Sequence, residues 1–317
     1  MSEFDLICRH FLKPTPGALL GIGDDAALLT PSVGNALAVS SDMLVAGIHF
    51  FHDADPFMLG HKVLAVNLSD MAAMGAKPRW VTLAISLPEA DEAWLERFSA
   101  GFFSLAESHD VELVGGDTTR GPLNLSVTIM GEVPQGQPLL RSGAQAGEEI
   151  WVSGNLGDAA LALVHMQGNA ILNDAEFSAC SPALHQPQPR VELGLALRGI
   201  AKSAIDISDG LLVDMGHMLE SSHVGARLNF SSLPVSDVLQ GLLPQLLIRQ
   251  CILSGGDDYE LCFTADVVSH EEILAIGAQL GLKLTCVGRI IAGQGCVVQD
   301  ETGVNIDVKG EGYDHFR

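Results

Sequence analysis

The residues most able to do chemistry in this chain are aspartates that stand among glycine, serine and apolar residues rather than among bases. A carboxylate in such surroundings is costly unless it is hydrogen-bonded or paired with a cation. Asp70 is the clearest example, because it interrupts the apolar stretch 63–74. The stretch 60–76 holds one basic residue, Lys62. The missing counter-charge predicts a divalent metal, and Mg²⁺ favours oxygen ligands shared between a few carboxylates and substrate phosphates.

Other acids share this setting, since they follow glycine or serine or lie beside a Ser-Asp pair. The full set is Asp24, Asp25, Asp42, Asp70, Asp117, Asp206, Asp209, Asp257 and Asp258. Taken singly, an aspartate after glycine or serine is equally an ordinary turn residue or helix N-cap. Their recurrence favours cation binding over capping, and the mid-helix position of Asp70 is the least typical of a cap.

Glycine-rich turns at 21–23, 115–116 and 255–256 would let backbone N–H groups approach phosphates closely. The sequence has no G-x-x-x-x-G-K-[ST] and neither H-R-D nor D-F-G, which excludes P-loop and protein-kinase sites. An EF-hand is excluded because its ligands would lie within about 12 residues. The predicted chemistry is therefore metal-assisted phosphate handling by residues far apart in the chain.

Composition narrows the class of protein. The 317 residues carry a formal net charge of -22, with 47% hydrophobic residues, so two domains with substantial cores are expected. The negative charge disfavours nucleic acid and anionic membranes as partners. Six cysteines without a C-x-x-C pair, no signal peptide and no long apolar run indicate a soluble cytoplasmic protein.

Hydrophobic periodicity interleaves helices and strands, which predicts an α/β (α+β) fold. In the first half we expect helices at 4–11, 56–74 and 91–110, and strands at 35–41, 80–87, 111–114 and 123–133. The Pro- and Gly-rich segment 134–147 is the expected junction. In the second half we expect helices at 158–167, 191–202 and 211–221, and strands at 150–153, 205–208, 259–264 and 284–291.

An ordered set of motifs covers nearly the whole chain. These are GIGDDAALL at 21–29, SSDMLVAGIHF at 40–50, NLSDMAAMGA at 67–76, GGDTTRG at 115–121, RSGA at 141–144, DISDGL at 206–211, SGGDDYEL at 254–261 and GYDHF at 312–316. Each Gly-Asp pair is weak evidence, but the ordered set is highly specific. The sequence resembles the thiamine-monophosphate kinase family.

The resemblance implies the two-domain fold shared with aminoimidazole-ribonucleotide synthetase. A mixed sheet with helices would form residues 1–137, the domain for ATP and metal binding and for dimerisation. Residues 138–317 would form an α/β domain completing the nucleotide and substrate site. The implied enzyme is a homodimer that uses ATP and several Mg²⁺ ions to convert thiamine monophosphate to thiamine diphosphate, the last step in synthesis of that cofactor.

The resemblance also implies roles for individual residues. The metal ligands would be Asp25, Ser40, Ser41, Asp42, Asp70, Asp117, Asp206 and Asp209. The ATP contacts would be Gly116, Asp117, Arg141 and Ser208, and the substrate contacts would be His49, Asp257 and Tyr313. Arg141 is equally typical of a surface ion pair, His49 of a structural histidine at a strand end, and Tyr313 of a C-terminal plug.

The acceptor in such a reaction is a phosphate oxygen, ionised near neutral pH because its second pKa is about 6. No dedicated general base is therefore expected, and direct in-line transfer would rest on positioning and charge neutralisation. Two alternatives stay open. One is another ATP-dependent synthetase of the same superfamily, for aminoimidazole ribonucleotide or selenophosphate, although Cys8 does not match the reactive position of the latter. The other is a non-catalytic sensor of nucleotide and metal.

Overall fold

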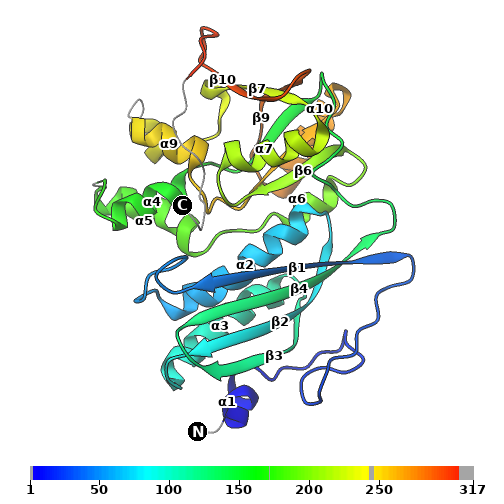
Figure 1. The fold of residues 1–317 in the computed structure, drawn as a ribbon, viewed down its shortest axis with the longest axis vertical. Coiled ribbons are helices and arrows are strands. Elements are labelled where there is room, and N and C mark those ends of the chain that lie inside the picture. The colour runs from blue at the N-terminus through cyan, green and yellow to red at the C-terminus, as the bar shows by residue number, and fades with distance from the viewer. Residues whose placement is uncertain (1–2, 171, 243–245, 307–317) are drawn as a thin grey trace. The chain divides into compact units, whose positions relative to one another are not determined.

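The structure, a computed structural model, describes residues 3–170, 172–242 and 246–306. Tyr313 and the motif at 312–316 lie outside the described residues. The chain divides into two compact units (Figure 1). Unit 1 comprises residues 1–71 and 76–136, and unit 2 comprises residues 72–75 and 137–317.

Unit 1 contains one four-stranded mixed sheet in the order β1-β4-β2-β3. Only β2 and β3 run parallel; the other neighbours are antiparallel. The elements are α1 (Glu3–His10), β1 (Asn35–Val45), α2 (Pro56–Ala73), β2 (Lys77–Leu87), α3 (Glu92–Ser108), β3 (Glu112–Arg120) and β4 (Asn124–Pro134).

Helices α2 and α3 cover one face of this sheet (Figure 1). Residues on the covered face, among them Val81, Val127 and Ile129, are fully buried. The two helices approach closely at glycines, since a Cβ on Gly101 would lie 1.9 Å from the Phe57 carbonyl oxygen. This contact fixes α2, the helix that carries Asp70, against the rest of the unit.

The opposite face of the sheet carries exposed apolar side chains. Leu37, Val39 and Met43 alternate along β1 and are 43%, 58% and 55% exposed. Neighbouring strands continue this face with Thr128 of β4 and Ala84 of β2. An apolar sheet face left open to solvent is typical of a surface that another protein covers.

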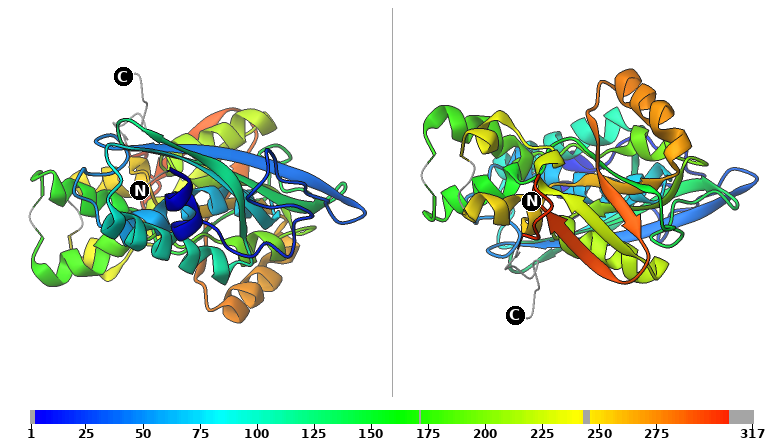
Figure 2. Two further views of the ribbon diagram at one scale, coloured as in Figure 1. Left: turned by 90° about the horizontal axis from the view of Figure 1, so that it is seen from below. Right: turned by 90° about the horizontal axis from the view of Figure 1, so that it is seen from above.

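Unit 2 contains a six-stranded mixed sheet in the order β10-β7-β9-β5-β8-β6. Figure 2 shows β10 beside β7, with which it pairs in parallel. The strands are β5 (Glu149–Ser153), β6 (Ala201–Ile207), β7 (Gly225–Asn229), β8 (Glu260–Ala265), β9 (Leu284–Ile291) and β10 (Gly295–Gln299). The helices are α4 (Asp158–Met166), α5 (Asp174–His185), α6 (Val191–Ala196), α7 (Leu211–Ser222), α8 (Asp237–Leu242), α9 (Leu246–Ser254) and α10 (His270–Leu280), with short 3₁₀ turns at Phe230–Ser232 and Val267–Ser269.

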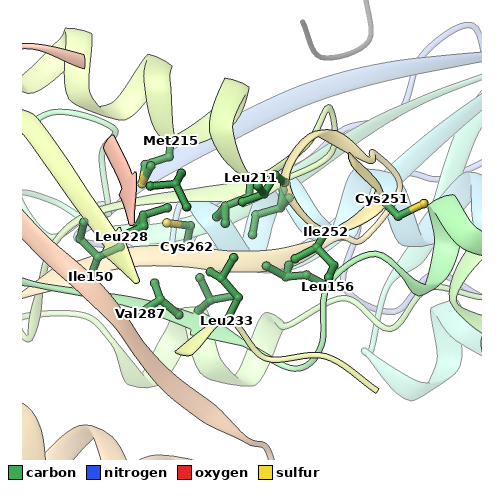
Figure 3. Close-up of a cluster of buried hydrophobic side chains, with 14 of the residues drawn as sticks. Ile150, Leu156, Leu211, Met215, Leu228, Leu233, Cys251, Ile252, Cys262 and Val287 are labelled. Atoms are coloured by element: carbon green, nitrogen blue, oxygen red, sulfur yellow. The ribbon is translucent and has the colours of Figure 1, made fainter. Parts of the chain in front are cut away.

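The core of unit 2 joins the sheet to α7 and its neighbours (Figure 3). Leu211 and Met215 of α7 pack with Ile150 of β5, Cys262 of β8 and Val287 of β9, all buried. Burying side chains of this size stabilises the unit by about 1.5–3 kcal/mol each. The N-terminal turn of α7 follows the Ser-Asp-Gly loop at 208–210, so this core also holds that loop in place.

The predicted α/β architecture, with a mixed sheet and helices in the first half and an α/β second half, is confirmed. Several boundaries are wrong. The strand expected to end at residue 41 in a polar turn continues to Val45, because Ser40 to Asp42 pair with β4 in the middle of the sheet. Strands β2 and β6 begin three and four residues before their expected starts at 80 and 205. The strand expected to end at the glycines 115–116 continues to Arg120, because Gly116 lacks the Cβ that would strike β2. The helix expected at 191–202 ends at Ala196, and Gly199, with φ 78°, leads into β6 instead. Helices α5, α8, α9 and α10 and strands β7 and β10 were not predicted.

In the part of the chain that the structure describes, no helix has both the length and the apolar character needed to cross a membrane.

The contact between α2 and α3 makes a testable prediction. Gly101→Ala is expected to lower the free energy of unfolding by about 1–3 kcal/mol, because the added methyl group has no space beside Phe57. Gly216→Ala in α7 is the matched control, since a Cβ there meets nothing within 4 Å. Gly216→Ala should raise the free energy of unfolding by about 0.5–1 kcal/mol, because alanine is favoured over glycine inside a helix. Urea unfolding monitored by circular dichroism measures both effects. Equal unfolding midpoints for the two variants would contradict this packing.

Candidate functional site

Helix α2 and strand β1 bring three of the predicted residues together in unit 1. The alternation of β1 places Ser40 and Asp42, both partly buried, on the helix side of the sheet. Ser40 Oγ donates to Asp70 Oδ2 at 2.5 Å, and the Asp42 backbone N–H donates to Asn67 Oδ1 at 3.3 Å. Asn67 lies one turn before Asp70 on α2. Its polarity within an apolar helix was the signal that sequence reasoning passed over.

Ser41 and Asp117 do not join this group within unit 1. Ser41 Oγ donates to the Val127 carbonyl oxygen at 3.1 Å and lies 3.0 Å from Thr128 Oγ1. Asp117 is exposed and pairs with Ala84 in β2. Because β1 and β3 are at opposite edges of the sheet, their backbones are three strand spacings, or about 14 Å, apart. Asp42 and Asp117 of one chain therefore cannot share a single cation.

Gly116 has a structural reason to be glycine. Its φ is 151°, and a Cβ would lie 1.9 Å from the Leu83 carbonyl oxygen. The close approach of β3 to β2 thus accounts for Gly116 whether or not a nucleotide contacts it.

Asp25 lies in the exposed segment between α1 and β1, next to Asp24, whose Oδ1 accepts from the Asp25 N–H at 2.9 Å. Two glutamates of the sheet hold this segment at its ends. Glu112 Oε1 accepts from the Gly17 N–H at 2.7 Å, and Glu132 Oε1 accepts from the Ser32 N–H at 3.0 Å. Burial alone would raise the pKa of Glu132, but its hydrogen bonds from Ser32 and Asn35 hold it below its usual value. Neither glutamate was singled out from the sequence.

His49 and Arg141 lie in ordered turns. His49 Nδ1 accepts from the Val45 N–H at 3.0 Å, so the neutral ring carries its proton on Nε2. Arg141 is exposed, and its carbonyl oxygen accepts from Ser222 Oγ at 3.2 Å. The same hydroxyl accepts from the Gly143 N–H at 3.1 Å. The last turn of α7 therefore orders the backbone of the RSGA motif.

In unit 2, two of the recognised motifs converge at the ends of β6 and β8. The Asp257 N–H donates to the Ser208 carbonyl oxygen, and the Tyr259 N–H donates to that of Ile207, both at 2.8 Å. Asp257 and Tyr259 have φ of 68° and 49°, a backbone conformation that residues other than glycine rarely adopt. Tyr259 OH also donates to Asp257 Oδ1 at 3.0 Å. The Asp257 carboxylate is thus oriented by the loop itself.

Asp206 and Asp209 flank the end of β6. Asp206 is buried opposite Leu261 of β8, and Asp209 is partly buried just beyond the strand. The backbone of this loop bonds to Asp214 of α7, which sequence reasoning missed. Burial and the neighbouring Asp209 charge together raise the pKa of Asp214 to about 6, against the lowering effect of its backbone donors.

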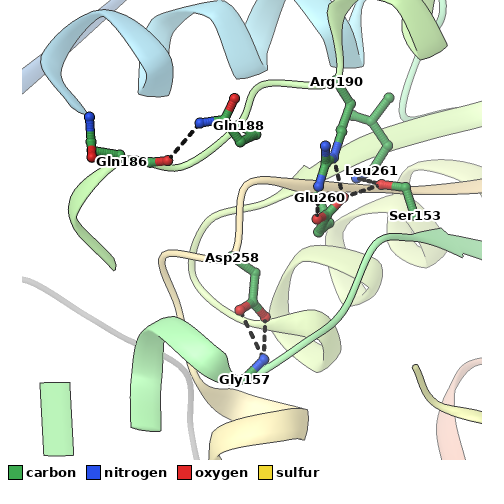
Figure 4. Close-up of polar contacts among 8 residues, drawn as sticks. All are labelled: Ser153, Gly157, Gln186, Gln188, Arg190, Asp258, Glu260 and Leu261. Atoms are coloured by element: carbon green, nitrogen blue, oxygen red, sulfur yellow. Dashed lines mark hydrogen bonds and ion pairs between the residues drawn. The ribbon is translucent and has the colours of Figure 1, made fainter. Parts of the chain in front are cut away.

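Two more acids brace the loop at 254–259 (Figure 4). Asp258 is buried and accepts from the Gly157 N–H through both carboxylate oxygens, at 2.9 and 3.1 Å. Its role is therefore to cap α4. Burial holds the pKa of Asp258 well above its usual value, and the negative charges around it add to that effect.

Glu260 follows directly and pairs with Arg190, whose Nε donates to Glu260 Oε2 at 2.6 Å (Figure 4). A second bond joins Arg190 Nη2 to Glu260 Oε1, and Ser153 Oγ donates to Glu260 Oε2 at 2.5 Å. Burial would lower the pKa of Arg190, but the hydrogen bond and charge of Glu260 raise it. This fully bonded pair anchors the start of β8 and hence the loop that carries Asp257.

Among the described residues, no three His, Cys, Asp or Glu side chains gather as a ready-made metal cluster. Of the predicted ligands in unit 1, Ser40 bonds to Asp70, and Asp42 lies on the same face of β1 as Ser40. In unit 2, Asp206 and Asp209 lie near the end of β6. This donor set suits Mg²⁺, which is held by one or two carboxylates together with substrate phosphates rather than by an all-protein cage. The residues present therefore fit that ion.

Comparison with known proteins identifies the class first. Residues 23–133 match the AIR synthase related protein, N-terminal domain, and residues 136–301 match the C-terminal domain of the same family. The chain belongs to this family of two-domain proteins.

Full-length relatives then narrow the assignment. The chain is 47% identical to thiamine-monophosphate kinase of Escherichia coli K12, with 99% of this chain and 98% of the relative covered. It is 33% identical to that of Bacillus subtilis, with both chains fully covered. The chain belongs to the thiamine-monophosphate kinase family.

Solved structures agree. Thiamine-monophosphate kinase from Stenotrophomonas maltophilia K279a superposes with TM-score 0.85 and 52% identity, covering 89% of this chain and 91% of that one. The structure of AaThiL complexed with AMPPCP and TMP gives TM-score 0.79 at 29% identity, covering 90% and 89%. Hydrogenase maturation protein HypE in complex with ATP, at 20% identity and TM-score 0.76 over 98% and 96%, shares the fold alone.

The buried Asp258 makes a prediction about pH. A carboxyl whose pKa is raised on folding stabilises the protein fully below its unfolded pKa of about 4, and this stability is lost as pH rises through the folded value. Asp258→Asn does not titrate but keeps an oxygen for the Gly157 N–H. As the pH rises above 4, the free energy of unfolding of Asp258→Asn should therefore increase relative to that of the wild type by up to about 1.4 kcal/mol per pH unit.

Urea unfolding at several values between pH 4 and 8 measures this difference. Asp258→Ala is the control, because it lacks any acceptor for the cap and should be less stable than Asp258→Asn throughout. Parallel stability curves for the wild type and Asp258→Asn would show that Asp258 is not held protonated.

Proposed function

We propose that this chain catalyses transfer of the γ-phosphoryl group of ATP to thiamine monophosphate, giving ADP and thiamine diphosphate, the last step in synthesis of that cofactor. The family membership supports this function, as does the neighbour complexed with AMPPCP, an ATP analogue, and with TMP. The observation that carries the proposal is the placement of Ser40 and Asp42 on the face of β1 that meets α2, where Ser40 bonds to Asp70 and the Asp42 backbone bonds to Asn67.

The chemistry requires little of the protein beyond placement. The attacking oxygen belongs to a phosphate that is already ionised, so no general base is assigned, and transfer is in line. Several Mg²⁺ ions, when bound, would neutralise charge on the phosphates of both substrates. The residues to hold them are Asp25, Ser40, Ser41, Asp42, Asp70, Asp117, Asp206 and Asp209. The placement of Asp42 and Asp117 on opposite edges of the unit 1 sheet supports several ions rather than one.

The remaining contacts divide between the two substrates. Gly116, Asp117, Arg141 and Ser208 are proposed to contact ATP, with Arg141 as a bidentate clamp on phosphate. His49, Asp257 and Tyr313 are proposed to contact thiamine monophosphate, Tyr313 by stacking on a ring. His49 has its Nδ1 occupied, so it would present Nε2–H as a donor.

The domain roles follow this division. Residues 1–137 would bind ATP and metal and form the dimer, and residues 138–317 would complete the nucleotide and substrate site. We place the enzyme in the cytoplasm, a location supported by six free cysteines. We propose neither nucleic acid nor membrane as a partner.

A homodimer is proposed from the exposed apolar face of the unit 1 sheet. A second copy of this chain fits that face because like surfaces pair across a two-fold axis. Val39→Lys would place a charge in the centre of the face, and analytical ultracentrifugation should then give monomers where the wild type gives dimers. Lys283→Glu, a charge change in unit 2, is the control. Monomeric wild type would contradict the proposal.

Neither alternative is favoured. The AIR synthase related domains are compatible with a synthetase of the same superfamily, but full-length identity favours the kinase. A non-catalytic sensor would bind ATP with Mg²⁺ and transfer nothing.

A single assay separates these functions. Purified protein with ATP and Mg²⁺ is given a panel of phosphorylated acceptors, and products are identified by mass spectrometry. Thiamine diphosphate should form with thiamine monophosphate, in equal amount with ADP. ADP release with another acceptor alone would indicate a synthetase, and nucleotide binding without any turnover would indicate a sensor.

In the same assay, Asp42→Asn should lower kcat at least about 100-fold while keeping the wild-type unfolding midpoint, because a carboxylate that neutralises charge in the transition state is lost. Asp110→Asn is the matched control, since Asp110 is exposed in the same unit and its φ of 54° is one that asparagine tolerates. Turnover of Asp42→Asn near that of Asp110→Asn at limiting Mg²⁺ would exclude the assigned role.

A further inference from the structure

The buried carboxylate of Asp214 accepts hydrogen bonds from the backbone amides of the loop at residues 208–210. Asp214 Oδ2 accepts three hydrogen bonds, from the N–H groups of Ser208 at 3.0 Å, Asp209 at 2.9 Å and Gly210 at 3.0 Å. Asp214 is 4% exposed and lies in the first turn of α7. Three donors on one oxygen specify the backbone path far more tightly than a single cap would.

The loop needs such an anchor. Strand β6 ends at Ile207 and α7 begins at Leu211, so three residues turn the chain from strand to helix. A backbone N–H that is buried without a partner is costly, and Gly210, the N-cap, supplies no side chain to bond the amides of this turn. Asp214 reaches back from inside the helix and satisfies the three amides of the turn.

The hydrogen bonds have a chemical consequence. Successive backbone N–H groups in a tight turn at a helix N-terminus ordinarily form a concavity that binds phosphate. At residues 208–210 an internal carboxylate already fills that concavity. The loop therefore offers no free amide to a nucleotide, and what it presents beyond its backbone are the Ser208 hydroxyl and the Asp209 carboxylate.

The loop at 208–210, which Asp214 holds, is in turn bonded to the loop at 254–259. Ser208 accepts from the Asp257 N–H at 2.8 Å, and a Cβ on Gly256 would lie 2.5 Å from the Ser208 carbonyl oxygen. A Cβ on Gly210 would lie 2.8 Å from the Ser254 carbonyl carbon. The loops are in contact with no spare room, so a shift of residues 208–210 would also displace Asp257.

We propose that Asp214 is a positioning residue that occupies the anion-binding turn of residues 208–210, so that the amides of this loop do not bind phosphate and its Asp209 acts on phosphates through divalent ions. The proposal rests on the phosphoryl-transfer function proposed above. It revises the expected part of Ser208, which would contact nucleotide through its hydroxyl and not its amide. Residues that orient a metal ligand typically change metal affinity 10–100-fold when removed.

Amide hydrogen exchange of the ligand-free protein, resolved to single residues by mass spectrometry, tests the anchor directly. In the wild type the amides of 208–210 should exchange slowly. In Asp214→Ala they should exchange at least about tenfold faster, while the β8 amides keep their rates. Asp214→Asn, which keeps one carbonyl oxygen of similar shape, should be intermediate and guards against a variant that does not fold. Asp174→Ala is the control, an exposed aspartate in the first turn of α5.

Binding of a non-hydrolysable ATP analogue, titrated with Mg²⁺ in a calorimeter, tests the second half of the proposal. Asp214→Ala or Asp214→Asn should raise the Mg²⁺ concentration for half-saturation about tenfold or more, a change that a purely structural role would not produce. Unchanged exchange at 208–210, or wild-type Mg²⁺ dependence in both variants, would overturn the proposal. Failure of the wild type to make thiamine diphosphate would reject the kinase function and leave the exchange result standing.

Discussion

Concentrated negative charge is the constraint on which the proposed site depends. The chain has a net charge of -22, and its recognised motifs place aspartates where two phosphorylated, anionic substrates are expected to bind. At 4 Å, two like unit charges repel by about 4 kcal/mol near a protein surface. Divalent cations would offset that repulsion, so substrate binding, catalysis and the choice of oxygen ligands all follow from one electrostatic requirement.

The fold meets this requirement by fixing carboxylates on backbone that cannot easily move. In unit 1, Asp70 is held on α2, which packs against α3 through a glycine contact. In unit 2, the loops that carry Asp209 and Asp257 are fastened by acids that have no place in the chemistry. Asp258 caps α4, Glu260 pairs with Arg190, and the remaining carboxylate takes up the amides of its own loop. Structural and functional carboxylates therefore lie close together in the sequence of these loops.

Sequence patterns predicted α2, β4 and α7 closely, because each has long periodicity and clear end signals. They also brought out Asp42 and Asp70, whose apolar surroundings are readable from neighbours in the chain. Asp258 was ambiguous for a physical reason, since a Gly-Gly-Asp-Asp string does not show which carboxylate caps a helix a hundred residues away. Asp214 was missed because an aspartate in a first helical turn is common, and only the folded loop shows its three bonds. Short strands such as β7 and β10 carry too few residues for a period to be recognised.

The measurement that tests the electrostatic account most directly is calorimetric titration of the wild-type protein with a non-hydrolysable ATP analogue, with saturating Mg²⁺ and with a chelator instead. The account predicts binding with Mg²⁺ and at least a hundredfold weaker binding, or none, in chelator, because the acids would then repel the triphosphate. Equal affinity under both conditions would contradict it, since the protein would then be holding phosphates with its own cations and amides.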